Sequence, residues 1–151
     1  FKAVYSEPMS QGTRCRQLAQ YIIFDSPLNM LCDAPTNYLK EEECTKFIAA
    51  IPTVWEETKA LCGEVGKYLA MARQKNDVWY VGALTNWDSR DMELDLSFLG
   101  EGEYKAEIFE DGINADRVGK DYKQKVIPVP ADRRLKIHMA SGGGHVMRIW
   151  K

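Results

Sequence analysis

Side chains that could do chemistry are spread thinly over this sequence of 151 residues. Glu56 and Glu57 are adjacent carboxylates, but on a strand they point to opposite faces and cannot act together on one bond. Residues 41–43 are all glutamates at the expected start of a helix, where carboxylates suit the positive end of the helix dipole. We interpret these acidic residues as solvated surface groups rather than as a catalytic pair.

The two histidines have no partners in the sequence that would make a site. His138 alternates with Ile137 and Met139, so we expect it on the outer face of a strand. His145 follows the glycines of the segment SGGGH. That segment lacks the Lys–Ser/Thr pair of a phosphate loop and precedes a strand, so it predicts a hairpin turn.

The four cysteines show neither a CxxC pair nor the spacing of a zinc site. An even number leaves disulfides open. Three of them fall on apolar faces of predicted helices or strands, which favours buried free thiols that pack as small hydrophobic groups. The cysteines are Cys15, Cys32, Cys44 and Cys62.

The composition indicates a globular chain. Hydrophobic residues make up 45% and charged residues 28%, with a formal net charge of -2. No basic patch dominates, which argues against nucleic acid as a partner. No apolar run approaches the roughly 20 residues of a membrane helix, so no span is expected. The first residues lack a secretory signal pattern, and Phe1 in place of methionine leaves processing, trimming or excision open.

Two helices with a strand between them are predicted in the first third of the chain. Residues 13–24 place apolar side chains at helical spacing, and Pro27 ends that helix. Residues 28–32 are nearly continuously apolar, as in a strand buried on both faces. Residues 41–51 form a second amphipathic pattern that Pro52 stops.

The pattern changes near residue 53 to that of an antiparallel sheet. Residues 67–74 and 78–85 read as strands that flank a polar turn. Residues 91–98 alternate strictly between apolar and polar side chains, and three further strands are predicted toward the C-terminus. Short strands separated by glycine turns indicate an antiparallel sandwich. The first part poses a problem, because an apolar strand needs neighbours on both edges. It either folds against the β part or is a remnant of a larger α/β domain upstream.

Four segments carry a resemblance that spans essentially the whole chain. They are EPMSQGTRCRQLAQYIIFDSPLNMLCDAPTNYL, IPTVWEETKALCGEVGKYLAMARQKNDVWYVGALTNW, DLSFLGEGEYKAEIFEDGINADR and ASGGGHV. The chain resembles the C-terminal end of family 97 glycoside hydrolases, and most of all the α-glucosidases of gut-bacterial starch-utilisation systems.

This resemblance implies an N-terminal β-supersandwich, a central (β/α)8 barrel and a C-terminal antiparallel β domain. Residues 10–25, 28–32 and 41–51 then resemble the seventh helix, the eighth strand and the last helix of the barrel. The expected fold class is α+β as a fragment. Residues 1–52 would be the remnant of the catalytic barrel and residues 53–151 an all-β, sandwich-like C-terminal domain.

The same resemblance implies hydrolysis of α-glucosidic bonds in oligosaccharides, a calcium ion in the parent enzyme and a periplasmic location. The catalytic carboxylates and the calcium ligands of the family lie on earlier barrel segments. We therefore expect no catalytic residue, no metal ligand and no cofactor within this chain. Whether the parent inverts or retains the anomeric configuration stays open.

Three residues are candidates for sugar contact. Asp33 follows the predicted eighth strand, at the end where barrels place functional groups, although a loop or helix-capping aspartate is the simpler reading. Glu7 precedes the seventh helix on the same side. Trp87, in the loop TNWDSRD, is the tryptophan best placed to stack on a sugar ring, whereas Trp79 and Trp150 are expected in the core or half-buried.

Three hypotheses about function follow from these observations. In the first, the chain closes and supports the barrel of its parent enzyme and is inactive alone. In the second, it is a carbohydrate-binding module in which Trp87 holds glycan. In the third, it self-associates through its uncovered strand and helices. The expected partners are the upstream barrel and, for the parent, an oligosaccharide.

Overall fold

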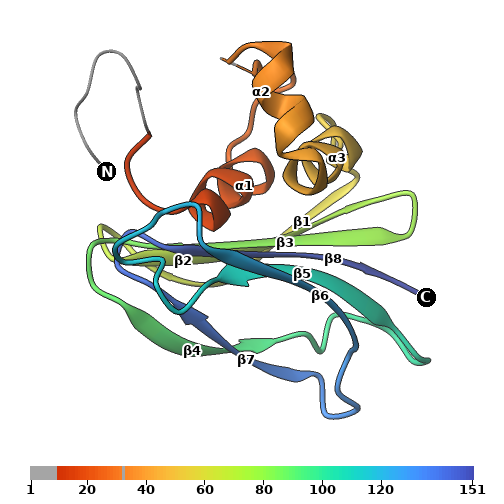
Figure 1. Ribbon diagram of the computed structural model, residues 1–151. Helices are drawn as coiled ribbons and strands as arrows, with labels where there is room; N and C mark the ends of the chain where they lie inside the picture. The colour runs from red at the N-terminus through yellow and green to blue at the C-terminus, as the bar shows by residue number, and fades with distance from the viewer. Residues whose placement is uncertain (1–9, 32) are drawn as a thin grey trace.

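The computed structural model describes residues 10–31 and 33–151, and in these it contains three helices and eight strands (Figure 1). The helices are α1 Arg14–Ile23, α2 Pro35–Lys40 and α3 Glu42–Ala50. The strands are β1 Glu57–Glu64, β2 Tyr68–Lys75, β3 Val78–Thr85, β4 Arg90–Asp95, β5 Lys105–Asp111, β6 Tyr122–Pro128, β7 Arg134–Met139 and β8 Gly144–Trp150. The structure is therefore mostly antiparallel sheet with few helices.

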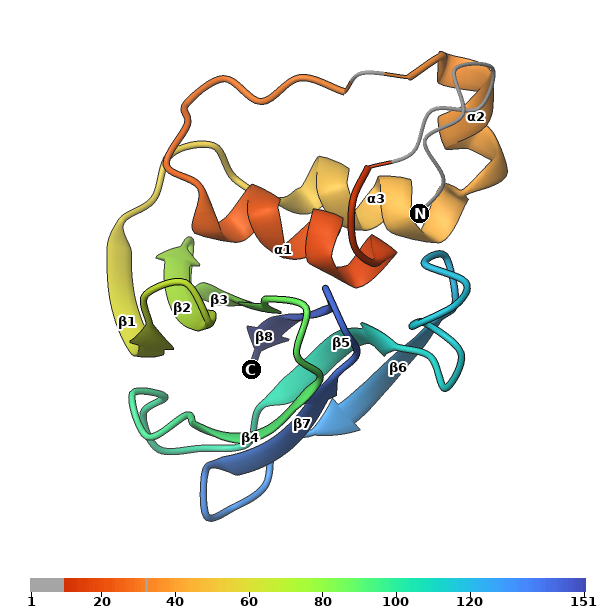
Figure 2. The ribbon, with the colours of Figure 1, turned by 90° about the vertical axis from the view of Figure 1, so that its left-hand side faces the viewer.

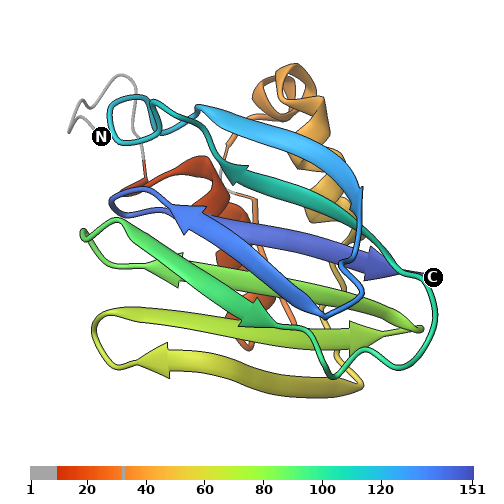
Figure 3. The same ribbon diagram turned by 90° about the horizontal axis from the view of Figure 1, so that it is seen from below.

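Six strands form one antiparallel sheet in the order β1-β2-β3-β8-β5-β6, and β4 pairs with β7 in a second sheet (Figure 3). The predicted hairpin is confirmed, with Lys75 opposite Val78 in the β2–β3 register. Asn76 and Asp77 take positive φ values of 51° and 61°, as the two central residues of a tight hairpin turn require.

The two sheets face each other across a core that we call the sandwich core. Alternation decides which side chains enter it, and Leu94 and Met139 point inward from the small sheet. The sandwich core comprises Ala70, Ala72, Trp79, Val81, Ala83, Leu94, Leu96, Leu99, Tyr104, Ala106, Ile108, Val129, Ile137, Met139, Met147 and Ile149. The expected burial of Trp79 is thereby confirmed.

Helices α1 and α3 cover the opposite face of the six-stranded sheet (Figures 1 and 2). We call the contact between them the helix-face core, which comprises Cys15, Leu18, Ala19, Ile22, Ile23, Cys44, Phe47, Tyr80, Phe109 and Val146. The close approach of α1 depends on Gly82, because a Cβ there would lie 3.0 Å from the Ala19 carbonyl oxygen. The molecule thus has three layers: helices, large sheet and small sheet.

The predicted strand at residues 28–32 is wrong for the residues that the structure describes. Residues 28–31 form no strand, and the side chains of Leu28 and Met30 are 74% and 76% exposed. No strand of the described chain lies alongside them to accept their backbone hydrogen bonds, so the apolar run stays extended in solvent. Cys32 lies outside the described residues.

Other elements differ from the sequence pattern in smaller ways. The first helix is confirmed, with Thr13 as its N-cap. A short helix, α2, occupies a stretch for which the sequence pattern predicted neither a helix nor a strand. The edge strands β1 and β6 were not predicted, because exposure on both sides removes the alternation that marks a strand (Figure 3). The division of the chain at residue 53 stays a prediction.

Candidate functional site

The first turn of α1 is fixed to two loops of the β region. The Thr13 hydroxyl oxygen accepts a hydrogen bond from the Arg16 amide at 3.1 Å, which caps the helix. The Thr13 amide donates to the Gly142 carbonyl at 3.1 Å, and the Arg14 amide donates to the Gly119 carbonyl at 2.7 Å. The start of the helix therefore lies over the β7–β8 and β5–β6 loops.

The last turns of α1 and α3 lie over the other side of the sheet. Arg73 of β2 is buried and donates from Nη2 to the Ile23 carbonyl at 3.1 Å. Tyr80 of β3 donates its hydroxyl to the Ala50 carbonyl at 2.9 Å. The start of α3 contacts β6, where the Tyr122 hydroxyl donates to Glu43. Both helices thus run in the same direction across the sheet.

The segment that joins these parallel helices returns along the side of the helix layer that faces away from the sheet (Figure 2). Its large apolar side chains are exposed instead of packed. They are Phe24, Leu28, Met30, Leu31 and Leu39, and we call them the outer apolar face. Large apolar side chains exposed along one connecting segment make it a candidate interaction surface.

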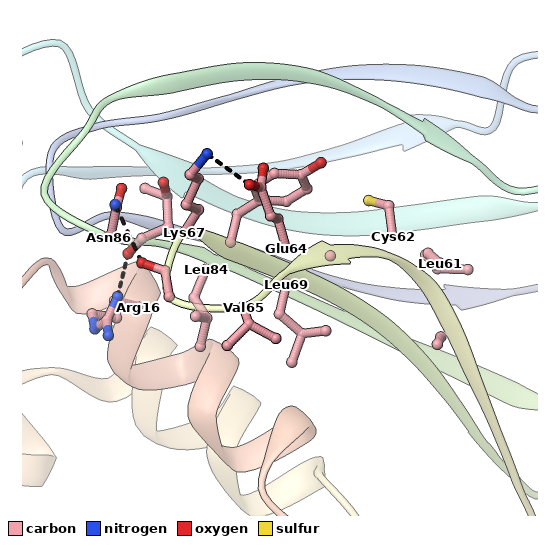
Figure 4. A pocket seen from close by; sticks show the side chains of 14 residues that line it. Arg16, Leu61, Cys62, Glu64, Val65, Lys67, Leu69, Leu84 and Asn86 are labelled. Atoms are coloured by element: carbon pink, nitrogen blue, oxygen red, sulfur yellow. Dashed lines mark hydrogen bonds and ion pairs between the residues drawn. The ribbon is translucent and has the colours of Figure 1, made fainter.

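A groove of about 630 Å³ lies between the β1–β2 hairpin and α1 (Figure 4). Val65, Leu69 and Leu84 point toward the side on which α1 lies, whereas Cys62 points the other way. The Arg16 side chain closes one end and donates to the Thr85 carbonyl. The groove is lined mainly by apolar atoms.

A second hollow of about 910 Å³ lies between the β4–β5 and β6–β7 connections. The cations of Arg133 and Lys151 lie 5.0 and 5.3 Å from the centre of the Tyr104 ring. Arg133 also donates to the carbonyls of Gly100 and Gly102. These contacts hold the two connections together and leave no set of groups that could act on a bond.

Buried ionisable groups beneath α1 serve the structure. Oδ2 of Asp111 accepts hydrogen bonds from the amides of Ala140 and Gly144 at 2.9 and 3.0 Å. Burial raises the pKa of Asp111, while these bonds act in the opposite direction. Burial also raises the pKa of Cys15, which keeps it a thiol and removes it as a nucleophile.

His145 is fully buried, whereas a residue next to a hairpin turn is usually exposed. Burial lowers the pKa of His145 to about 3, so its imidazole is neutral at pH 7. His138 is on the outer face as expected and lies 2.7 Å from Asp91. Neither histidine is part of a catalytic set.

The described part of the chain offers no group of three or more His, Cys, Asp or Glu side chains that could hold a metal ion. Within the same residues, no helix is long and apolar enough to cross a membrane. The free cysteines that the structure describes are Cys15, Cys44 and Cys62, of which the first two are buried.

Of the three candidates for sugar contact, Asp33 and Trp87 lie within the described residues. Asp33 is exposed, and its Oδ1 accepts hydrogen bonds from the Asn37 side chain at 2.8 Å and from the Ala34 amide at 2.6 Å. These bonds, Asn37 first, lower the pKa of Asp33, which fits a carboxylate that organises the start of α2. Glu7 lies outside the described residues.

Trp87 is exposed, as its loop position suggests, with 59% of its surface open to solvent. Its carbonyl accepts a hydrogen bond from the Ser141 hydroxyl at 2.6 Å. A Cβ on Gly142 would lie 2.6 Å from Cζ3 of Trp87, so the ring rests directly on this glycine. Trp87 thus lies against the turn between β7 and β8, whereas Asp33 lies at the start of α2.

Sequence reasoning missed Arg73 and Asp111, the charged residues that fix the helix layer. A signal for Arg73 was present, because it alternates with Met71 and Leu69 and so shares their buried face. Asp111 ends an alternating strand next to a glycine, a position that usually indicates an exposed turn. Only its bonds to Ala140 and Gly144, far along the chain, give it a buried role.

Residues 54–150 match the family described as "Glycosyl-hydrolase 97 C-terminal, oligomerisation". This chain belongs to that family. The resemblance drawn from the sequence is therefore confirmed at the level of the family, and the β part of the chain is the region that carries it.

Longer proteins resemble the chain over nearly its whole length. It is 58% identical to a retaining alpha-galactosidase of Bacteroides thetaiotaomicron, over 96% of the chain and 22% of that protein. A glycoside hydrolase family 97 enzyme from Pseudoalteromonas sp. strain K8, solved with acarbose, matches with a TM-score of 0.87 and 34% identity over 93% of the chain and 23% of that structure. A beta-arabinopyranosidase matches with a TM-score of 0.78 and 26% identity over 93% of the chain and 22% of that structure. The chain thus spans less than a quarter of the length of these relatives.

Proposed function

We propose that this chain is the C-terminal assembly part of a family 97 glycoside hydrolase and does not itself break glycosidic bonds. The observation that carries the proposal is the outer apolar face, where Leu28 and Met30 are about three-quarters exposed on the side of the helices away from the sheet. A surface of this kind needs a covering partner. The family match and the relatives' greater length support a partner within the same polypeptide.

The partner that we propose is an upstream (β/α)8 barrel that this chain closes. Parallel helices joined by a returning extended segment are the arrangement of an α–β–α unit. In the longer enzyme, residues 28–32 would pair with barrel strands on both edges and become the eighth strand. The sheet of the β part would then cover the outside of the last two barrel helices.

We propose α-galactosides as the substrate class of the parent enzyme, with retention of configuration. The support is the 58% identity to a retaining alpha-galactosidase. α-Glucosides, which the sequence resemblance implies, are the second candidate and are supported by the 34% identity to an enzyme solved with acarbose. The catalytic carboxylates, a calcium ion and a periplasmic location belong to this proposal about the parent, in which segments upstream of this chain carry the residues for them.

The experiment uses the encoded full-length enzyme beside the isolated chain. p-Nitrophenyl α-galactoside and α-glucoside are offered to both, and the anomer released first is followed by NMR. We expect turnover of the galactoside by the full-length enzyme and none by the chain alone. Turnover by the isolated chain would refute the assembly role, and preference for the glucoside would refute only the substrate class.

The family description also supports a role of the chain in self-association of the parent. Sedimentation velocity of the full-length enzyme, with and without residues 53–151, measures this role directly. We expect the intact enzyme to be oligomeric in a concentration-dependent manner. A monomer at all concentrations would contradict this part of the proposal.

Carbohydrate binding at Trp87 is the second candidate function. The favouring observation is the exposed indole supported from below by Gly142, which leaves an aromatic surface free for a sugar ring. Malto- and galacto-oligosaccharides are titrated into the chain while tryptophan fluorescence is recorded. A saturable change that Trp87→Ala abolishes would support binding, and an unchanged signal up to millimolar sugar would exclude it.

A further inference from the structure

The groove between the β1–β2 hairpin and α1 is an apolar surface with an exposed rim. Val65 stands at its edge with its whole side chain in solvent, and Ala60 is also exposed. Leu69 and Leu84 form its floor and continue the helix-face core outward past α1 (Figure 4). Apolar side chains in this position gain free energy when another apolar surface covers them.

Four of the polar side chains around the groove are paired within the chain. Glu64 and Lys67 form an ion pair at 2.6 Å, the Arg16 guanidinium donates to the Thr85 carbonyl, and the Asn86 amide donates to the Gly66 carbonyl. A polar small molecule such as a sugar would find few free hydrogen-bonding groups there. The groove is therefore suited to apolar side chains rather than to a polar ligand.

The position of the groove relative to the helices identifies its occupant. Helices α1 and α3 are parallel and lie side by side, and the β1–β2 turn extends beyond α1 on the flank away from α3 (Figures 1 and 3). In α/β architectures the helices on one face form a continuous layer of parallel neighbours. The free flank of α1 is the place where the preceding helix of such a layer would lie.

We propose that the groove receives the apolar side of a third helix, parallel to α1, from the polypeptide that precedes this chain in the longer enzyme. This inference rests on the proposed function and specifies the barrel element that touches the β domain. Because the chain spans 22% of the retaining alpha-galactosidase, such a parent has ample polypeptide to supply the helix. A covalently linked helix also reaches the groove at a high effective concentration, which favours it over a second copy of the chain.

Hydrogen exchange compares the isolated chain with the full-length enzyme. We expect the amides of residues 60–69 to exchange at least about tenfold more slowly in the full-length enzyme, as happens when a surface segment becomes covered. Residues 28–31 are followed in the same experiment. Their protection tests the proposed function, and protection at residues 60–69 tests the groove, so the two can fail separately.

A pair of matched variants tests the apolar contact. Val65→Asp should leave the melting temperature of the isolated chain unchanged, because the side chain is fully exposed there, and should lower that of the full-length enzyme. Val126→Asp is the control, since Val126 is 55% exposed on the opposite edge strand, β6. It should have the same small effect in both proteins.

Two results would overturn the inference. If residues 60–69 exchange equally fast in both proteins while residues 28–31 become protected, no helix covers the groove. If protection at residues 60–69 depends on the concentration of the full-length enzyme, the occupant is a second copy instead of an upstream helix.

Discussion

The two faces of the six-stranded sheet carry apolar cores of different kinds. The sandwich core lies between the two sheets and is built entirely from residues of the β part. The helix-face core combines α1 and α3 with Tyr80, Phe109 and Val146 of the same sheet. The first core is closed by strands on both sides. The apolar side chains of the second core continue outward into the groove. The segment on the far side of its helices exposes Leu28 and Met30.

This difference reflects which apolar side chains find neighbours within the described residues. A side chain such as Leu94 finds all its neighbours within the β part, because strand pairing and hairpin turns bring them there. Leu28 has the same apolar character but no neighbouring strand in the described chain. The sandwich core is therefore complete within the described residues, whereas the helix layer leaves large apolar side chains exposed.

The largest expected effect comes from removing one leucine from each core. Leu18 and Leu94 are 1% and 0% exposed, and each substitution to alanine should lower the free energy of unfolding by about 2–5 kcal/mol. Urea denaturation followed by tryptophan fluorescence and far-UV circular dichroism measures both. We expect one cooperative transition in each variant, because the two cores share one sheet.

A split transition in Leu18→Ala, with helix lost before sheet, would separate the two cores. The helix layer would then unfold as an independent unit, and the two cores would not form one cooperative structure. Coincident transitions by both probes would confirm that α1 and α3 fold together with the β part.

A smaller effect is expected from Arg73, which joins the two regions from the sheet side. Its side chain is 6% exposed, donates to the Ile23 carbonyl and lies 5.7 Å from the centre of the Trp55 ring. Arg73→Met keeps the length but removes the donor from the end of α1, at a cost of about 1–3 kcal/mol. Thermal unfolding by circular dichroism measures the loss. Lys75→Met, on the same strand but partly exposed, is the control and should change little.

The pH dependence of stability tests whether His145, on the sandwich side of the large sheet, is buried in its neutral form. The pKa of His145 in the folded chain, about 3, lies below its ordinary value near 6.5. Between these values the unfolded chain binds one more proton, so this contribution to stability is present at neutral pH and is lost as the pH falls. The loss amounts to about 1.4 kcal/mol per pH unit.

His145→Gln removes this proton uptake. We expect the variant to lose about 2 kcal/mol less stability than the wild type between pH 6.5 and pH 5, as measured by urea denaturation. Parallel pH profiles for the two proteins would show that His145 is accessible to protons in the folded state. His138→Gln is a matched control, because His138 lies on the surface beside Asp91.

The smallest effect in the isolated chain is expected at the outer apolar face. Leu28→Ser should change its stability by less than about 0.5 kcal/mol, because the side chain is 74% exposed. In the full-length enzyme the same change should lower the melting temperature clearly, since the residue would lie in the eighth strand. Differential scanning calorimetry of both proteins distinguishes the cases. Equal, negligible effects would show that the face stays uncovered.

Elements with local signals were predicted well from the sequence. The helix at Arg14–Ile23 follows from the apolar spacing of residues 13–24. The β2–β3 hairpin follows from two apolar runs around Asn76 and Asp77. The exposed position of Trp87 in a polar loop was also predictable. Each of these features depends on residues close together in the chain.

Features that depend on distant contacts were not predicted. The strand pattern at residues 28–32 is strong, yet a strand needs partners for its backbone, and the described chain supplies none. The edge strands β1 and β6 have no fully buried face, so their sequences lack the alternation of apolar and polar residues that predicts a strand.

The sequence by itself determined the family, two of the three helices and most of the strands, because spacing and turn residues act over short distances and the resemblance spans long segments. The tertiary structure alone decided that α1 and α3 are parallel, that they share a core with the sheet, and that a groove remains beside α1. It also decided that residues 28–31 stay outside the fold. The physical reason is that burial and backbone pairing depend on which segments meet in space, and no strand of the described residues meets residues 28–31.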